Sequence, residues 1–260
     1  MAVNWRFGKK LLDVKPPAFR AVTAVKNRAV SYWKGVSLPF PEPGVRLIRQ
    51  GDVDDVTARM AELKADLEEA VEGLDRHYAE LKTQARRRLG SLYNDADYPV
   101  SLRGMFDMAW EFPSCEAPPY LQQLSPELYR QECQRVQSRF NEAVQLAEQA
   151  FTEELAKLIS HLTERLSGSD DGRAKIFRDS AVENLTQFFD RFRQLNIGSS
   201  EQLDNLVADA QRIIRGVEPQ ALRDSAGLRQ HVATEMSRVQ SVLDGLLVDK
   251  PRRNILRRPK

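Results

Sequence analysis

Cysteine, histidine and long hydrophobic runs are all scarce in this chain of 260 residues. Its two cysteines, Cys115 and Cys133, cannot supply a disulfide framework, and they lack the CxxC spacing of a metal or redox site. No run of about 18 apolar residues is present, which argues against a transmembrane helix. The opening residues, MAVNWRFGKK, lack the apolar segment of a secretory signal. We therefore expect a soluble protein of the reducing cytoplasm that does not insert into a membrane.

Recognisable catalytic motifs are also absent. The sequence has no Walker-type glycine loop, no GxSxG nucleophile elbow and no HExxH zinc motif. Each of the three histidines, His77, His161 and His231, stands alone. His161 and Glu164 have the spacing found in metal sites of helical bundles, but such a site needs a second pair on a facing helix. We therefore expect no enzyme activity, no cofactor and no metal.

Charge is nearly balanced overall but uneven along the chain. The formal net charge is +2. Residues 1–52 contain ten Lys and Arg against three Asp and Glu, and residues 249–260 contain six against one, so the segment between them is acidic. Basic ends on an acidic body fit binding of nucleic acid, binding of an acidic protein or self-association, and they equally fit solvated ends without a specific partner.

The first 51 residues are expected to form a basic, partly helical arm. Short helices are predicted over residues 9–14 and 18–32. They are separate helices because Pro16 and Pro17 interrupt the segment between them. Prolines at positions 39, 41 and 43 then favour extended structure. The aromatic residues of this arm either anchor it on the protein's own body or stack on bases.

Two long apolar stripes at helical spacing follow in the central part of the chain. The stripe of residues 52–92 recurs every three or four positions, and residues 125–167 carry an 11-residue repeat after the helix start signal SPE. A helix of about 40 residues spans roughly 60 Å, and so narrow a stripe needs a partner of similar length. We therefore predict an all-α protein in which residues 52–167 form a long, nearly straight, antiparallel coiled-coil-like hairpin. Whether the two helices pair within one chain or between two chains is open.

Residues 93–124, between the two predicted helices, differ in composition from both. They contain four prolines and several aromatic residues, and they are far more numerous than a helical turn needs. We predict a small folded tip with a short helix over residues 101–110. The tip is the first candidate for a partner-binding surface, although its aromatic residues also suit a small core of its own; the candidate residues are Tyr93, Tyr98, Phe106, Trp110 and Phe112.

The remaining residues, 168–248, are predicted to form shorter helices that pack against the hairpin. The expected helices cover residues 173–195, 201–215 and about 219–248. A basic tail, residues 249–260, completes the chain. Its arginines are candidates for binding nucleic acid or an acidic partner; they are Arg252, Arg253, Arg257 and Arg258.

Several short motifs occur in a recognisable order between residues 25 and 215. They are Leu47-Ile48, Tyr78 within the first long helix, the patch Tyr93-Asn94-Asp97-Tyr98-Pro99, Phe106 and Phe112-Pro113. In this order the chain resembles an uncharacterised helical family of bacteria, phages and mobile elements. Members of that family are often encoded near MoxR-type AAA+ ATPases and von Willebrand A-domain proteins. The resemblance implies no catalytic residues and suggests an accessory or adaptor subunit that works beside an ATPase.

Three functions agree with these observations. The first is a non-catalytic helical scaffold or adaptor that binds other proteins, including an AAA+ ATPase or a second copy of itself. The second is a nucleic-acid-binding protein that uses its basic arm and tail. The third is a structural subunit of a phage-like particle, in which long helices connect neighbouring copies.

Overall fold

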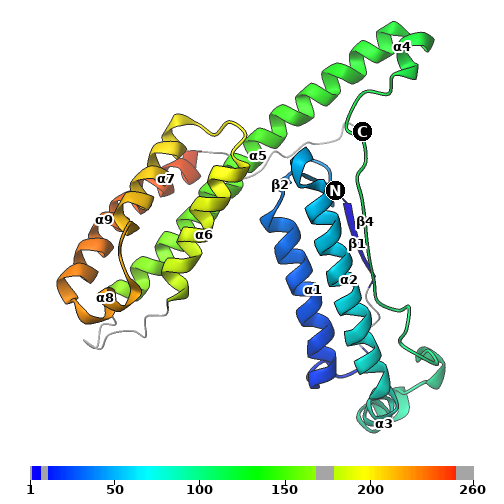
Figure 1. Ribbon diagram of the computed structural model, residues 1–260. Helices are drawn as coiled ribbons and strands as arrows, with labels where there is room; N and C mark the ends of the chain where they lie inside the picture. The colour runs from blue at the N-terminus through cyan, green and yellow to red at the C-terminus, as the bar shows by residue number, and fades with distance from the viewer. Residues whose placement is uncertain (1, 7–10, 168–178, 250–260) are drawn as a thin grey trace. The chain divides into compact units, whose positions relative to one another are not determined.

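The computed structural model describes residues 2–6, 11–167 and 179–249 of the chain (Figure 1). The chain divides into two compact units, Met1–Gln137 and Ser138–Lys260. Helix dominates the described residues, and the strands are short, so the predicted all-α class is confirmed. None of the helices in these residues combines the length and the apolar character that crossing a bilayer requires.

The core of the first unit lies between two antiparallel helices, α1 (Pro17–Gly35) and α2 (Val53–Arg76) (Figure 1). Helix α1 begins with Pro17 at its first position, where a missing N–H costs nothing, and it confirms the helix predicted over residues 18–32. It buries Val22, Val25 and Ala29 against the stripe of α2. The buried residues of that stripe are Val56, Met60, Leu63, Leu67, Val71 and Leu74.

The helix predicted over residues 52–92 is broken, and a continuous helix there is wrong. Helix α2 ends at Arg76, and α3 (Tyr78–Leu89) runs in a clearly different direction (Figure 1). His77 lies at φ −95° and ψ 0°, outside the α region, and its N–H bonds the Leu74 carbonyl at 3.1 Å instead of continuing the α-helical ladder. The apolar stripe nevertheless continues, because α3 buries Tyr78, Leu81 and Ala85.

The predicted coiled-coil pairing of the two long helices is not confirmed. Within the first unit, the stripe of α2 packs against α1 and against buried residues of the segment 98–108. In the second unit, the second long helix, α5 (Pro126–Leu166), packs its Phe151 ring against α6. Periodic spacing shows that a helix face is buried, but several shorter neighbours cover such a face as well as one long partner does.

The first unit also contains two small antiparallel sheets. Strand β1 (Ala2–Arg6) pairs with β4 (Asp107–Glu111), and β2 (Leu38–Pro39) pairs with β3 (Arg46–Leu47) in the predicted extended region. The short helix predicted over residues 101–110 is therefore wrong, because burial alternates along β4 with the period of a strand: Met108 is buried and its neighbours are exposed. Residues 11–14 are not helical, and the rest of the helix predicted over residues 9–14 lies outside the described residues.

Short helical segments complete the first unit. Single 3₁₀ turns occur at Gln50–Asp52, Gly90–Leu92 and Asp95–Asp97. Helix α4 (Tyr120–Leu124) then leads into α5 through Ser125, whose carbonyl accepts the Tyr129 N–H at 3.1 Å.

The second unit consists of the later part of α5 with α6 (Ser180–Leu195), α7 (Glu201–Ile214), α8 (Pro219–Asp224) and α9 (Ala226–Asp249). Ser200 caps α7 by accepting the Leu203 N–H at 3.4 Å. The helix expected over 219–248 is divided at Ser225, whose hydroxyl accepts the Leu228 N–H at 3.2 Å. Four phenylalanines form an aromatic cluster in this core: Phe151, Phe188, Phe189 and Phe192.

Candidate partner-binding surface

Most of the predicted tip aromatics face the core of the first unit. Tyr98 is only 7% exposed, and Tyr93, Phe106 and Trp110 are half-buried against the α1–α2 core. Phe112, at 42% exposure, is the one tip candidate that is open to solvent. Four of the five aromatic residues therefore pack within the protein itself, and the role of the five in partner binding stays a prediction.

One carboxylate on α2 fixes the loop that carries these aromatics. Asp75 Oδ1 accepts the Leu102 N–H at 2.7 Å, and Asp75 Oδ2 accepts the Ser101 hydroxyl at 3.0 Å. Arg103 adds an ion pair to the same carboxylate at 3.8 Å. Because Leu102 is itself buried in the core, these contacts attach the segment before β4 to the C-terminal end of α2.

A second polar cluster orients Tyr93 at the end of α3. The Tyr93 ring stacks on Tyr98 with centroids 4.9 Å apart, and its hydroxyl donates to Asp95 Oδ1 at 2.8 Å. This hydrogen bond to a carboxylate raises the pKa of Tyr93 to about 12, and it lowers the pKa of Asp95 together with the neighbouring Lys82 ammonium.

The largest run of exposed apolar side chains lies on α4 and the first half of α5. Tyr120 is 60% exposed, Leu124 76% and Leu128 51%. The buried residues of α5 all lie from Ala143 onward, so its first four turns bury none. We call the following set the α4–α5 surface: Tyr120, Leu124, Leu128, Tyr129, Cys133 and Val136. The sequence predicted that the stripe beginning at Tyr129 is buried by a partner helix, and this part of it is not.

Within the α4–α5 surface, Tyr129 and Cys133 are one helical turn apart and contact each other. A hydrogen bond between their side chains raises the pKa of the Tyr129 hydroxyl. Cys133 is exposed, whereas Cys115 is half-buried. An exposed thiol in the centre of this surface gives a direct chemical probe of whether a partner covers it.

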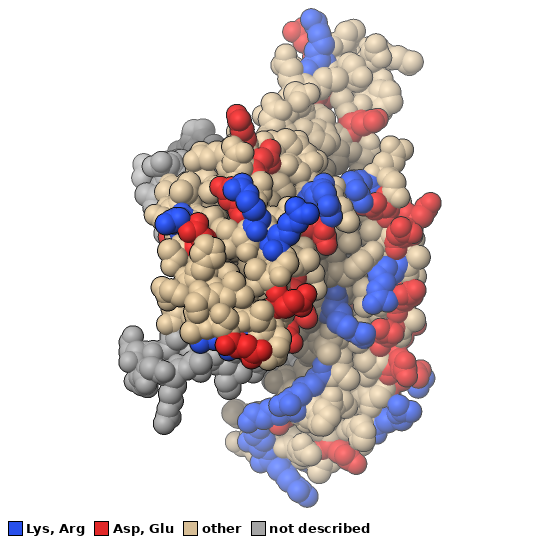
Figure 2. Space-filling model, turned by 60° about the vertical axis from the view of Figure 1, so that its left-hand side comes forward, with Lys and Arg blue, Asp and Glu red and all other residues tan. Residues whose placement is uncertain are grey.

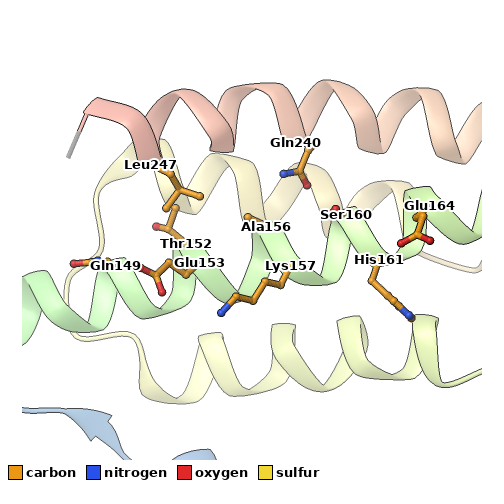
Figure 3. Close-up of a pocket in the computed structure, with 10 residues that line it drawn as sticks. All are labelled: Gln149, Thr152, Glu153, Ala156, Lys157, Ser160, His161, Glu164, Gln240 and Leu247. Carbon is orange, nitrogen blue, oxygen red and sulfur yellow. Dashed lines mark hydrogen bonds between the residues drawn. The ribbon is translucent and has the colours of Figure 1, made fainter. Parts of the chain in front are cut away.

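A groove of about 620 Å³ runs between α5 and α9 in the second unit (Figure 3). Several of its polar groups are hydrogen-bonded within one helix: Gln149 donates to Glu153 at 2.9 Å, and Thr152 donates to the Glu148 carbonyl at 2.8 Å. Gln240 donates to Asp244 at 2.8 Å, while its buried Oε1 atom has no partner. The lining residues are Gln149, Thr152, Glu153, Ala156, Lys157, Ser160, His161, Glu164, Gln240 and Leu247.

This groove contains the His161–Glu164 pair that the sequence singled out. Figure 3 shows both side chains on α5, with no second His and carboxylate pair facing them among the labelled residues. Over the part of the chain that the structure describes, no three His, Cys, Asp or Glu side chains come together as metal ligands.

Three arginines of the basic N-terminal arm contact other residues of the first unit. In the N-terminal arm, Arg28 pairs with Asp66 at 2.9 Å and Arg49 pairs with Asp52 at 2.7 Å. Arg46 donates to the Ser37 carbonyl at 2.7 Å and lies over the Trp33 ring. The candidate arginines of the tail lie outside the described residues; they are Arg252, Arg253, Arg257 and Arg258.

Comparison with known proteins adds no relative to this description. No family model, no curated protein and no solved structure matches the chain. The resemblance to a helical family of bacteria, phages and mobile elements is therefore unsupported by a match.

The sequence does contain a signal for the exposed part of α5. The stripe in the buried half is rich in leucine, as at Leu155 and Leu162, whereas the exposed half carries Tyr129, Cys133 and Val136 at the same spacing. The weaker apolar character of this half favours a surface that is exposed to water in the free protein and covered when a partner binds.

Proposed function

We propose that this protein is a non-catalytic helical scaffold or adaptor that binds a partner protein through the α4–α5 surface. One observation carries the proposal: three large apolar side chains, Tyr120, Leu124 and Leu128, are more than half exposed within nine residues. Isolated exposed apolar residues are common, but three large ones so close together, two on α4 and one in the first turn of α5, are typical of a protein-binding site.

The two folded units support the same proposal. Each has its own hydrophobic core, and the continuous helix α5 belongs in part to both. The α4–α5 surface is therefore not needed to complete either core. A partner with an apolar helix face suits it best, because Tyr129, Cys133 and Val136 of α5 recur at helical spacing and none of them is buried.

The resemblance described above makes an AAA+ ATPase the first candidate partner and a second copy of this chain the next. A self-associating surface would also fit the structural subunit of a phage-like particle. Light scattering during size-exclusion chromatography separates these cases, because a chain that is monomeric at high concentration excludes self-association as the main role.

The decisive experiment compares two matched double variants as bait in a pull-down from the native host. Leu124→Glu/Leu128→Glu places charges on the α4–α5 surface, whereas Ile197→Glu/Val242→Glu changes two apolar residues of the second unit that are each 45% exposed. Burying a leucine contributes about 1.5–3 kcal/mol, so losing two should weaken a real complex by roughly 100-fold or more. The control variant should retain the partner.

Labelling of Cys133 provides an independent readout with the purified partner. Maleimide should react more slowly with Cys133 when the partner is bound, while Cys115 serves as the internal reference. A partner that binds the Leu124→Glu/Leu128→Glu variant as tightly as the wild type, or that leaves the Cys133 rate unchanged, would show that the α4–α5 surface is not the binding site.

A further inference from the structure

The end of α3 carries an unusual concentration of positive charge. Lys82, Arg86, Arg87 and Arg88 lie within two turns, and no acidic residue occurs between Glu80 and Asp95. We call these four residues the α3 basic cluster. Its three arginines are exposed, and Figure 2 shows Lys and Arg side chains gathered over the lower end of the first unit, where Figure 1 places α3. This cluster was not among the basic segments that the sequence ranked first.

Two of the three guanidinium groups are held in place by contacts that leave their charge free. The Arg86 guanidinium lies 5.6 Å from the centroid of the Tyr93 ring, which is itself fixed by Tyr98 and Asp95. Arg88 Nη2 donates to the Leu11 carbonyl at 2.8 Å. An arginine has five N–H donors, so both groups keep most of theirs for another acceptor.

The cluster has an electrostatic cost that the protein offsets only in part, through the Asp95 carboxylate, which lies near Lys82 and Arg86. Lys82 and Arg86 are one turn apart, a spacing at which like charges destabilise a helix by about 0.2–0.5 kcal/mol. Asp95 pairs with Lys82 at 3.2 Å, but across the described residues none of the three arginines has a carboxylate within ion-pair distance. A basic residue at a helix C-terminus is favourable by itself, yet three in a row exceed what the helix dipole needs. A bound anion would remove the repulsion.

The geometry of the helix selects the kind of anion. Successive residues point about 100° apart around the axis, so Arg86, Arg87 and Arg88 diverge and cannot converge on one phosphate group. A polymer with regularly repeated negative charges can contact all three arginines. The Tyr93 ring already stacks on Tyr98 and lies against the Arg86 guanidinium, so it is not free to stack on a base. The arrangement therefore suits contacts with the charged backbone of a polymer and not the recognition of individual bases.

We propose that the α3 basic cluster binds the phosphodiester backbone of a nucleic acid. The arginine side chain favours phosphate, because its planar fork donates two parallel hydrogen bonds to neighbouring phosphate oxygens. Binding of this type is independent of sequence and falls steeply as salt concentration rises. The site is separate from the α4–α5 surface and does not depend on the function proposed for it.

The test measures the fluorescence anisotropy of a labelled single-stranded DNA 20-mer with the full chain, at several salt concentrations. Arg86→Gln/Arg87→Gln/Arg88→Gln is compared with Arg193→Gln/Arg212→Gln/Arg238→Gln, which removes the same charge from exposed arginines of the second unit. Each phosphate contact contributes about 0.7 to the salt slope for a single strand, so the cluster variant should lose about 2 from the slope and roughly 100-fold in affinity at about 0.1 M salt. The control variant should bind like the wild type.

A single variant guards against a folding artefact. Arg87 has no ring contact and no hydrogen bond of its side chain among the described residues, so Arg87→Gln should leave the circular dichroism and thermal stability unchanged and still weaken binding about fivefold. Absence of binding at low salt, or an equal loss in the control variant, would overturn the proposal. Polyglutamate that competes as well as the oligonucleotide at equal charge would also overturn it, in favour of an acidic protein.

Discussion

Replacing Asp75 by alanine should destabilise the first unit by about 3 kcal/mol, because each hydrogen bond to a charged group contributes about 1.5–3 kcal/mol. The substitution removes the acceptor of the Ser101 hydroxyl at 3.0 Å and of the Leu102 N–H at 2.7 Å. The Asp75 side chain is 21% exposed, so water replaces these bonds only in part. We therefore expect a loss in free energy of unfolding that corresponds to one full hydrogen bond and part of a second, and not to two full hydrogen bonds.

A graded series makes this prediction specific. Asp75→Asn keeps a carbonyl oxygen for the Leu102 N–H but loses the charge, so it should cost about 1 kcal/mol. Glu72→Ala removes only the ion pair from Glu72 to Arg103, at 3.5 Å between two exposed side chains, and should cost less than about 0.5 kcal/mol.

The assay is urea unfolding followed by tryptophan fluorescence. Trp5, Trp33 and Trp110 are the only tryptophans, and all three belong to the first unit, so the signal reports on that unit alone. With a slope of about 2 kcal/mol per molar urea, Asp75→Ala should lower the midpoint by about 1.5 M. An Asp75→Ala midpoint within about 0.2 M of the wild type, or a Glu72→Ala loss as large as that of Asp75→Ala, would refute the role given to this carboxylate.

Two further predictions concern the tyrosine cluster and the second core. The hydrogen bond from Tyr93 to Asp95 raises the pKa of Tyr93 to about 12, so its stabilisation is complete below the ordinary tyrosine pKa and is lost as the pH rises through about 12. Asp95→Asn should lower that pKa, and tyrosinate absorbance during a pH titration measures the change; an unaltered titration would contradict the assignment. Phe188→Ala should cost the second unit about 3–5 kcal/mol, because Phe188 is 1% exposed and contacts three other rings. Hydrogen exchange of α6 amides checks this, with the half-exposed Phe140 replaced by alanine as the control, for which protection should hardly change.

Local signals explain what could be predicted from the sequence. The first position of α1 is marked by Pro17 and the start of α7 by Ser200, and both helices carry apolar residues at helical spacing. Each of these signals acts within a few residues. The elements that depend on them therefore appear where they were expected.

Long-range contacts explain what could not be predicted. The period of the α2 stripe shows a buried face but not that α1 covers it, and the strand β4 exists because it pairs with residues about a hundred positions earlier. The same limit applies to the candidate site. The aromatic residues Tyr98 and Trp110 are packed inward by contacts with distant helices, whereas Leu124 and Leu128 are left exposed because nothing in either core reaches them.

The pairing of β1 with β4 also sets an order of events when the chain is made. These strands join residues 2–6 to residues 107–111, so α1, α2 and α3 all lie inside the loop that the pair closes. Closing so long a loop is slow unless the helices form first and shorten it. At about 5–20 residues per second, a ribosome needs roughly 5–20 s between the two strands. During that interval the backbone N–H and C=O groups of β1 have no partner strand. The segment is therefore accessible to chaperones and to incorrect strand pairing.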